Sequence, residues 1–174
     1  MRSFYYFLIG LLLFYIDTAI ALVIPMNIAG KAIIFVPHLL LMYLLLVTIY
    51  RSANLAIVLS VVLGLITDLY YGQIYGIYLF GYILFVVIVD RCFKAYYRDT
   101  GMVFWLMLIF ALLNEVYTAL IYGILGVIQF DIIHFVLFRL MPTFVLNLLL
   151  LVILQPLIFK YFKKVETKID SNKP

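Results

Sequence analysis

The chain has 174 residues, of which 68% are hydrophobic and only 11% are charged. A soluble domain is about half apolar, and a disordered chain needs high charge with few apolar residues, so both classes are excluded. The composition predicts a single integral membrane domain with little chain outside the bilayer. In such a protein we interpret the net charge of +4 as a topology signal and expect no nucleic-acid partner.

Six apolar runs follow one another along the chain, and five of them reach the roughly 17–25 residues that a spanning helix needs. Backbone polar groups in lipid must pair within their own segment, so we expect helices. A membrane barrel is excluded because apolar and polar residues do not alternate along the runs. The predicted fold is an all-α, polytopic six-helix bundle over residues 1–162, followed by a basic cytoplasmic tail at 163–174; the expected spans are 4–24, 32–50, 53–71, 74–89, 102–126 and 132–159.

Lysine and arginine residues predict the direction of the bundle. With the N-terminus inside, ten basic residues fall on the inner side and only Lys31 on the outer side. Because short cytoplasmic loops are enriched in Lys and Arg, we expect both termini in the cytoplasm. The inner loop after the fourth span carries Arg91, Lys94 and Arg98. We expect this basic loop to face anionic lipid or a cytoplasmic partner.

Ionisable residues of five different spans fall at a similar depth in the outer half of the bilayer, by the rise of about 1.5 Å per helical residue. Such groups are costly in lipid, so they usually face the bundle interior and pair. Two interpretations stay open for this layer: hydrogen-bonded glue between helices, or an interaction site. The layer consists of Asp17, His38, Asp68, Glu115 and Arg139.

The last span carries a polar stripe formed by Arg139, Thr143 and Asn147. Their spacing of four residues places them on one helix face. Pro142 lies beside the stripe and has no backbone N–H, so we expect a kink and a carbonyl freed for a neighbouring segment. Arg139 is the only arginine or lysine within the spans, which predicts that it pairs with a carboxylate of the layer. Asn114 and Glu115 of the fifth span are expected to meet the stripe.

The turn between the third and fourth spans is rich in glycine. We expect Gly72 to adopt the left-handed backbone conformation of a tight turn. Gly76 and Gly81 are expected to allow close approach of neighbouring helices. Gln73 is expected to hydrogen-bond within the turn or to cap a helix end. The turn therefore has a structural explanation that requires no ligand.

The sequence contains no motif for catalysis or for a cofactor. It has no phosphate-binding glycine loop, its two histidines do not form an HExxH motif, and its serines do not lie in a nucleophile elbow. We interpret the 15 tyrosines and 15 phenylalanines as interfacial belts and lipid-facing packing. We therefore expect a protein that is not an enzyme and that needs no metal or cofactor.

Two stretches resemble the family of rod shape-determining proteins called MreD. They are GLITDLYYGQIYGIYLF at 64–80 and RLMPTFVLNLLLLVILQPL at 139–157. The resemblance implies a non-enzymatic scaffold of the bacterial cell-elongation machinery in the cytoplasmic membrane. It implies binding to an MreC-like bitopic protein, beside RodA, a class B penicillin-binding protein and MreB. The residues that carry it are Gly64, Asp68, Leu69, Gly72, Gly76, Arg139, Pro142 and Asn147.

Two other hypotheses stay open. MreD-like proteins look similar in fold to the substrate-binding S-components of energy-coupling factor vitamin transporters. Those proteins carry an Ala-x-x-x-Ala face in their first helix, whereas Ala19 and Ala21 here are only two residues apart, which disfavours the transporter hypothesis. An intramembrane enzyme would need an acid–base pair, for which Asp68 and Glu115 are the candidates.

Overall fold

The computed structural model describes residues 2–24, 27–28, 31–72, 74–93, 100–128 and 131–170. Helix α1 (Arg2–Val23) is followed by a two-stranded antiparallel pair, β1 (Asn27–Ile28) and β2 (Lys31–Ala32), in which Asn27 is opposite Ala32. The helices α2 (Leu39–Tyr50), α3 (Ala53–Tyr71) and α4 (Ile77–Ile88) come next, and the π-helical turn η1 (Val89–Phe93) continues α4. Helix α5 (Thr100–Ile124) precedes α6 (Ile132–Phe135), the π-helical turn η3 (Val136–Leu140) and α7 (Met141–Asp170).

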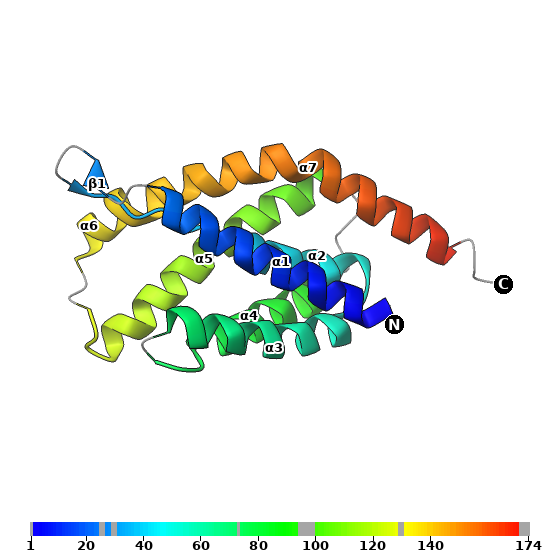
Figure 1. The fold of residues 1–174 in the computed structure, drawn as a ribbon, viewed down its shortest axis with the longest axis horizontal. Helices are drawn as coiled ribbons and strands as arrows, with labels where there is room; N and C mark the ends of the chain where they lie inside the picture. Colours follow the sequence, from blue (N-terminus) through cyan, green and yellow to red (C-terminus); the bar gives the residue numbers. More distant parts are fainter. Residues whose placement is uncertain are drawn as a thin grey trace.

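The bundle runs back and forth between two ends (Figure 1). The start of α1 and the end of α7 lie at the same end of the molecule, and α3 and α4 form a closely packed pair. Four of the described helices are long and apolar enough to cross a membrane. The predicted all-α membrane fold is thereby confirmed, and these four segments are Phe4–Val23, Ala53–Tyr71, Gly101–Ile124 and Ile132–Leu154.

Helix α2 lies in the middle of the bundle. Ten of its 12 residues are buried, as expected for a helix that is hydrophobic on every face. Its length of about 18 Å is well short of a hydrocarbon core of about 30 Å. The predicted helix over 32–50 begins only at Leu39, and residues 33–38, here called the extended segment, belong to no helix or strand. Pro37 explains the difference, because proline lacks an N–H and restricts the preceding residue to extended conformations.

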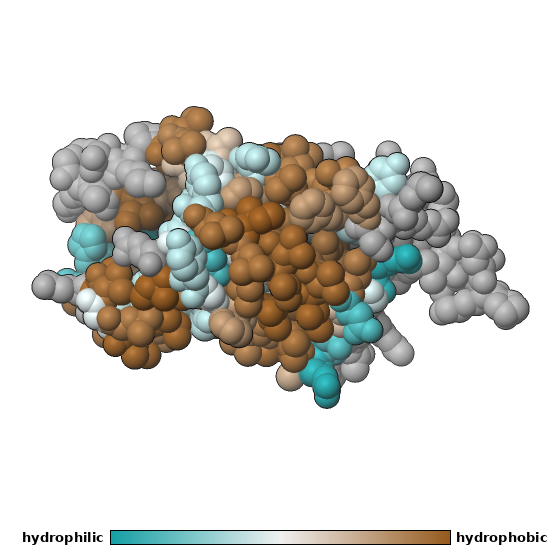
Figure 2. Space-filling model, turned by 60° about the horizontal axis from the view of Figure 1, so that its bottom comes forward, coloured by the Kyte–Doolittle hydropathy of each residue, from teal (hydrophilic) through white to brown (hydrophobic). Residues whose placement is uncertain are grey.

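The outside of the bundle is apolar. Figure 2 shows the side on which α3 and α4 lie as a broad hydrophobic surface, crossed by a band of more polar residues. On these two helices Val58 and Leu65 of α3, and Phe80 and Leu84 of α4, expose between 45% and 66% of their surface. A soluble monomer rarely exposes an apolar patch of this extent, so these side chains are placed for contact with lipid or with another membrane helix.

The glycine turn differs from the prediction in one respect. Gly72 has an ordinary extended conformation, with φ −75°, whereas Gly76 has φ +102° at the start of α4. The expectation of a left-handed Gly72 was wrong, because the chain reverses at Gly76, four residues later. Gly72 is still required, since a Cβ there would collide with the carbonyl oxygen of Asp68. Close helix approach is confirmed at Gly81, where a Cβ would lie 2.8 Å from the Tyr117 ring, but not at Gly76, where the nearest atoms belong to Phe80 of the same helix. Gln73 lies outside the described residues.

Candidate functional site

Glu115 lies at the centre of a buried cluster that joins three segments of the chain. Its Oε1 is 3.0 Å from His38 Nε2, and its Oε2 accepts a hydrogen bond of 2.6 Å from Arg139 Nε. The Glu115 side chain is only 1% exposed and that of His38 4%, whereas that of Arg139 is 28% exposed. Each carboxylate oxygen therefore has a nitrogen partner. The cluster ties α5 to η3 and to the residue that precedes α2.

Asp17 of α1 caps the first turn of α2. Its Oδ1 accepts from the Leu39 backbone N–H at 3.1 Å and its Oδ2 from that of Leu40 at 2.9 Å. The first N–H groups of a helix have no partner within the helix, and they carry partial positive charge. A carboxylate from a neighbouring helix satisfies both requirements. Asp17 thus stabilises a helix start that lies inside the bundle.

Asp68 of α3 caps the first turn of α4, as Asp17 caps that of α2. From α3 its two oxygens accept from the backbone N–H groups of Tyr78, at 2.9 Å, and Leu79, at 3.0 Å. These residues belong to the first turn of α4, so the carboxylate replaces the partners that this turn lacks. Close packing makes the contact feasible, because a Cβ on Gly64 would lie 2.7 Å from the Leu79 Cα. The aspartate that precedes the glycine turn is therefore the cap that fixes the turn.

The backbone of the extended segment 33–38 is held by hydrogen bonds to side chains of α7 and to a carbonyl of η3. Thr143 Oγ1 accepts from the Val36 N–H at 3.2 Å, and Asn147 Oδ1 accepts from the His38 N–H at 2.9 Å. Asn147 Nδ2 donates to the carbonyl oxygens of Val36 and Thr143, both at 2.8 Å. Extended backbone is tolerated at membrane depth only where protein groups satisfy it, and the stripe on α7 supplies those groups.

Pro142 provides one further acceptor for the extended segment. In a regular helix the N–H of residue 142 would donate to the Phe138 carbonyl, but proline has none. The Ile34 N–H donates to that carbonyl instead, at 2.8 Å. The predicted freeing of a carbonyl by Pro142 is therefore confirmed, and the neighbour that uses it is the extended segment.

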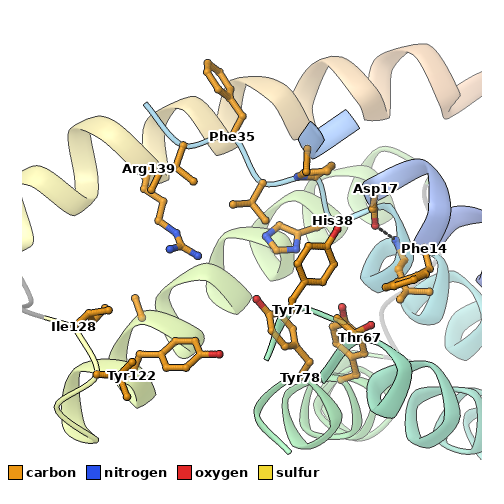
Figure 3. A pocket seen from close by; sticks show the side chains of 18 residues that line it. Phe14, Asp17, Phe35, His38, Thr67, Tyr71, Tyr78, Tyr122, Ile128 and Arg139 are labelled. Atoms are coloured by element: carbon orange, nitrogen blue, oxygen red, sulfur yellow. Dashed lines mark hydrogen bonds between the residues drawn. The ribbon is translucent and has the colours of Figure 1, made fainter. Parts of the chain in front are cut away.

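A cavity of about 320 Å³ lies between α1, the extended segment, α4, the end of α5 and η3. In Figure 3 Arg139 and His38 enter it from one side, while the hydroxyl groups of Tyr78 and Tyr122 point toward them from the other. We call it the central cavity. Its walls are formed by Phe14, Asp17, Ala21, residues 34–38, Leu40, Thr67, Tyr71, Tyr78, Tyr82, Ala119, Tyr122, Val127, Ile128 and Arg139.

Comparison with known proteins identifies the family. A family model described as rod shape-determining protein MreD matches residues 1–165. The chain belongs to the MreD family. A curated relative, the rod shape-determining protein MreD of Bacillus subtilis (strain 168), is 27% identical over 137 residues, which cover 75% of this chain and 78% of the relative. No solved structure matches the chain. The protein is thus a rod shape-determining membrane protein, as the resemblance implied.

The predicted polar layer divides into three groups in this MreD-family chain. Arg139 reaches Glu115, which also contacts His38, so this part of the expected pairing is present. Asp17 and Asp68 have no described contact with Arg139 and accept backbone N–H groups instead. All three residues of the stripe form hydrogen bonds to other segments. Arg139 donates to Glu115 of α5, whereas Thr143 and Asn147 bond the backbone of the extended segment.

Two other predictions concern polar groups at the edges of this arrangement. Asn114 makes no described hydrogen bond to the stripe; its Oδ1 lies near Gly81 of α4. In the basic loop Arg91 is exposed within η1, whereas Lys94 and Arg98 lie outside the described residues. Among the described residues no group of three His, Cys, Asp or Glu side chains could hold a metal ion.

The tyrosines of the central cavity are hard to predict from the sequence. The interpretation of tyrosines as interfacial belts is wrong for Tyr82, which is buried, and for Tyr78, which is half-buried. The available signal was their spacing of four residues, which places both on one face of α4. Tyr122 lies on α5, one turn after Thr118. Its inward direction depends on the rotation of α5, which no spacing in the sequence fixes.

Proposed function

We propose that this protein is a non-enzymatic scaffold of the bacterial cell-elongation machinery that binds an MreC-like bitopic membrane protein. RodA, a class B penicillin-binding protein and MreB would belong to the same larger complex. The observation that carries the proposal is the use of the buried polar side chains. Asp17, Asp68, Glu115 and Asn147 are all engaged in contacts that hold one segment of the bundle against another.

Such contacts favour a structural role over an intramembrane enzyme. A catalytic acid or base needs a reacting group within hydrogen-bond reach, whereas Asp68 faces the first turn of α4 with both oxygens. Glu115 is likewise engaged by nitrogen atoms on both sides. A bundle fixed in this way can present a constant apolar surface to the single span of a bitopic partner.

The proposed location is the bacterial cytoplasmic membrane, with both termini in the cytoplasm. The excess of basic residues on one side supports this orientation, as does the position of the start of α1 and the end of α7 at one end of the bundle (Figure 1). Cys92 offers a direct test, because it is the only cysteine and it is exposed in η1, on the expected cytoplasmic side. A membrane-impermeant maleimide should label Cys92 in inverted vesicles and leave it unlabelled in right-side-out vesicles.

Orientation has a matched control in the same chain. The variant Cys92→Ser with Leu125→Cys moves the one thiol to the exposed turn directly after α5, at the end of α5 that lies farther along the chain from η1. This variant should show the reverse pattern of labelling. Labelling of Cys92 from the outside would contradict the proposed topology.

The scaffold role is tested by purifying a tagged copy from its native membrane in a mild detergent and identifying the co-purified proteins by mass spectrometry. Recovery of an MreC-like bitopic protein, with peptidoglycan synthases at lower yield, is the expected result. Recovery of a transmembrane coupling subunit with paired ATPases would instead support the transporter hypothesis and overturn this proposal.

A further inference from the structure

Several groups that face the central cavity can donate hydrogen bonds for which no described residue supplies the acceptor. The Arg139 guanidinium has five N–H groups and no acceptor, and only its Nε is used, by Glu115. No described residue bonds its two terminal nitrogens. The hydroxyl groups of Tyr78 and Tyr122 point into the same space (Figure 3) and also have no described hydrogen-bond partner. Four unused guanidinium N–H groups and two phenol groups thus converge there.

The two carboxylates at the central cavity are already engaged. Both oxygens of Asp17 accept backbone N–H groups of α2, and both oxygens of Glu115, beside the cavity, have nitrogen partners. Donors without matching acceptors favour a ligand that is itself rich in acceptors. Arginine and tyrosine hydroxyls together suit the oxygens of a phosphate group, which arginine binds through two N–H groups at once.

The rest of the cavity wall indicates which kind of molecule the phosphate group belongs to. Phe14, Ala21 and Ile34 make it apolar, and Val127 and Ile128 also line it while exposing 37% and 40% of their surface. The wall therefore continues onto the apolar outside of the bundle. A volume of about 320 Å³ is at the lower end of the range of about 300–1,000 Å³ for ligand pockets. It has room for a headgroup but not for acyl chains.

From these features we propose that the central cavity binds the phosphate headgroup of an anionic membrane lipid, with Arg139, Tyr78 and Tyr122 as the phosphate donors. The acyl chains leave past Val127 and Ile128 and lie along the apolar outside. This site is distinct from the proposed scaffold role and does not depend on it. Basic pockets between membrane helices bind lipid headgroups on the cytoplasmic side of other membrane proteins; the cavity proposed here would do so in the outer half of the bilayer, with donors that are identified individually.

The test measures lipid bound to the full-length protein by native mass spectrometry after reconstitution in nanodiscs. One set of nanodiscs contains phosphatidylglycerol and a second only phosphatidylcholine; a third sample is the protein in detergent with inorganic phosphate. We expect one retained phosphatidylglycerol per chain, little phosphatidylcholine, and no effect of inorganic phosphate on the thermal unfolding temperature. If the protein retained no lipid, and if neither of the two lipids nor inorganic phosphate changed its stability, the cavity would be water-filled and the proposal would be overturned.

Variants separate binding from folding. Tyr122→Phe removes one hydroxyl that bonds no described residue, so the fold should persist while the lipid affinity falls roughly fivefold, the worth of one hydrogen bond. Tyr15→Phe, an exposed tyrosine of α1, is the matched control and should leave the affinity unchanged. Arg139→Lys should weaken binding by roughly tenfold or more, because lysine lacks the planar fork, whereas Arg51→Gln at the far end of α2 should not.

Three results would overturn the assignment. Equal lipid retention by Tyr122→Phe, Arg139→Lys and the wild type would place the lipid elsewhere on the bundle. Stabilisation by inorganic phosphate without lipid retention would assign the cavity to a soluble anion. Crosslinking of a photoreactive residue at Tyr122 to a co-purified protein, with no lipid adduct, would assign it to a segment of a protein partner.

Discussion

Replacing Asn147 by leucine tests whether the extended segment depends on its hydrogen bonds to α7. The change keeps a similar side-chain size but removes bonds to the His38 N–H, the Val36 carbonyl and the Thr143 carbonyl. Thr143 keeps its helical bond from the backbone of residue 147, so the buried His38 N–H and the half-buried Val36 carbonyl lose their partners. Each such group costs about 1–3 kcal/mol in soluble proteins, while membrane hydrogen bonds reach at most about 1.7 kcal/mol. We therefore expect a loss of about 2–3 kcal/mol in the free energy of unfolding.

The loss can be measured by reversible denaturation in mixed micelles of a mild detergent and sodium dodecyl sulfate. Hydrogen exchange should at the same time show faster exchange of the backbone amides of Ile34, Val36 and His38, which donate to η3 and α7. Asn54→Leu makes the same chemical change at an exposed position of α3 and should leave both quantities unchanged. An Asn147→Leu variant within about 0.5 kcal/mol of the wild type, with unchanged amide protection, would refute the reasoning.

Three further predictions concern the other buried contacts, each measured by unfolding in the same micelles. Asp68→Ala should cost about 1–2 kcal/mol by removing the cap of α4, and Asp68→Asn less because one acceptor remains; equal losses would contradict the capping role. Gly76→Ala should cost about 1–2 kcal/mol at φ +102°, and more than Gly126→Ala, which has φ +70° and open space around it. Arg139→Leu should cost about 3 kcal/mol of unfolding free energy, because it leaves the buried Glu115 with His38 alone. The cost of Arg139→Leu should be smaller in a chain that already carries Glu115→Gln. If the costs of the two substitutions simply added, the two side chains would not be coupled.

Much of the fold follows from general rules applied to the sequence. Spanning length and backbone pairing in lipid predict the helices, and the missing N–H of Pro142 predicts a free carbonyl whatever the tertiary structure is. The pairing of Arg139 with a carboxylate follows from charge, since no other arginine or lysine lies within the spans. These features depend on composition and local chemistry, which the sequence contains directly.

The partners of the acidic residues could not be predicted, for a physical reason. Spacing gives the depth of a side chain along a helix axis but not the rotation of that helix about its axis. Depth alone therefore left Arg139 with three candidate carboxylates. The donors that Asp17 and Asp68 actually use are backbone N–H groups of α2 and α4, which become available only where those helices start inside the bundle. The predicted helix began at residue 32, so the backbone N–H groups of Leu39 and Leu40 were expected to bond within that helix and not to Asp17.

The central claim is that the polar network holds the bundle in the shape that its bitopic partner binds. The most direct test compares the amount of MreC-like protein that co-purifies with tagged wild type, with Asn147→Leu, and with Gly76→Ala. The first variant alters the network, whereas the second strains the turn between α3 and α4. We predict that Asn147→Leu loses most of the partner while Gly76→Ala, which also destabilises the bundle, retains it. Full recovery of the partner by Asn147→Leu would contradict the account.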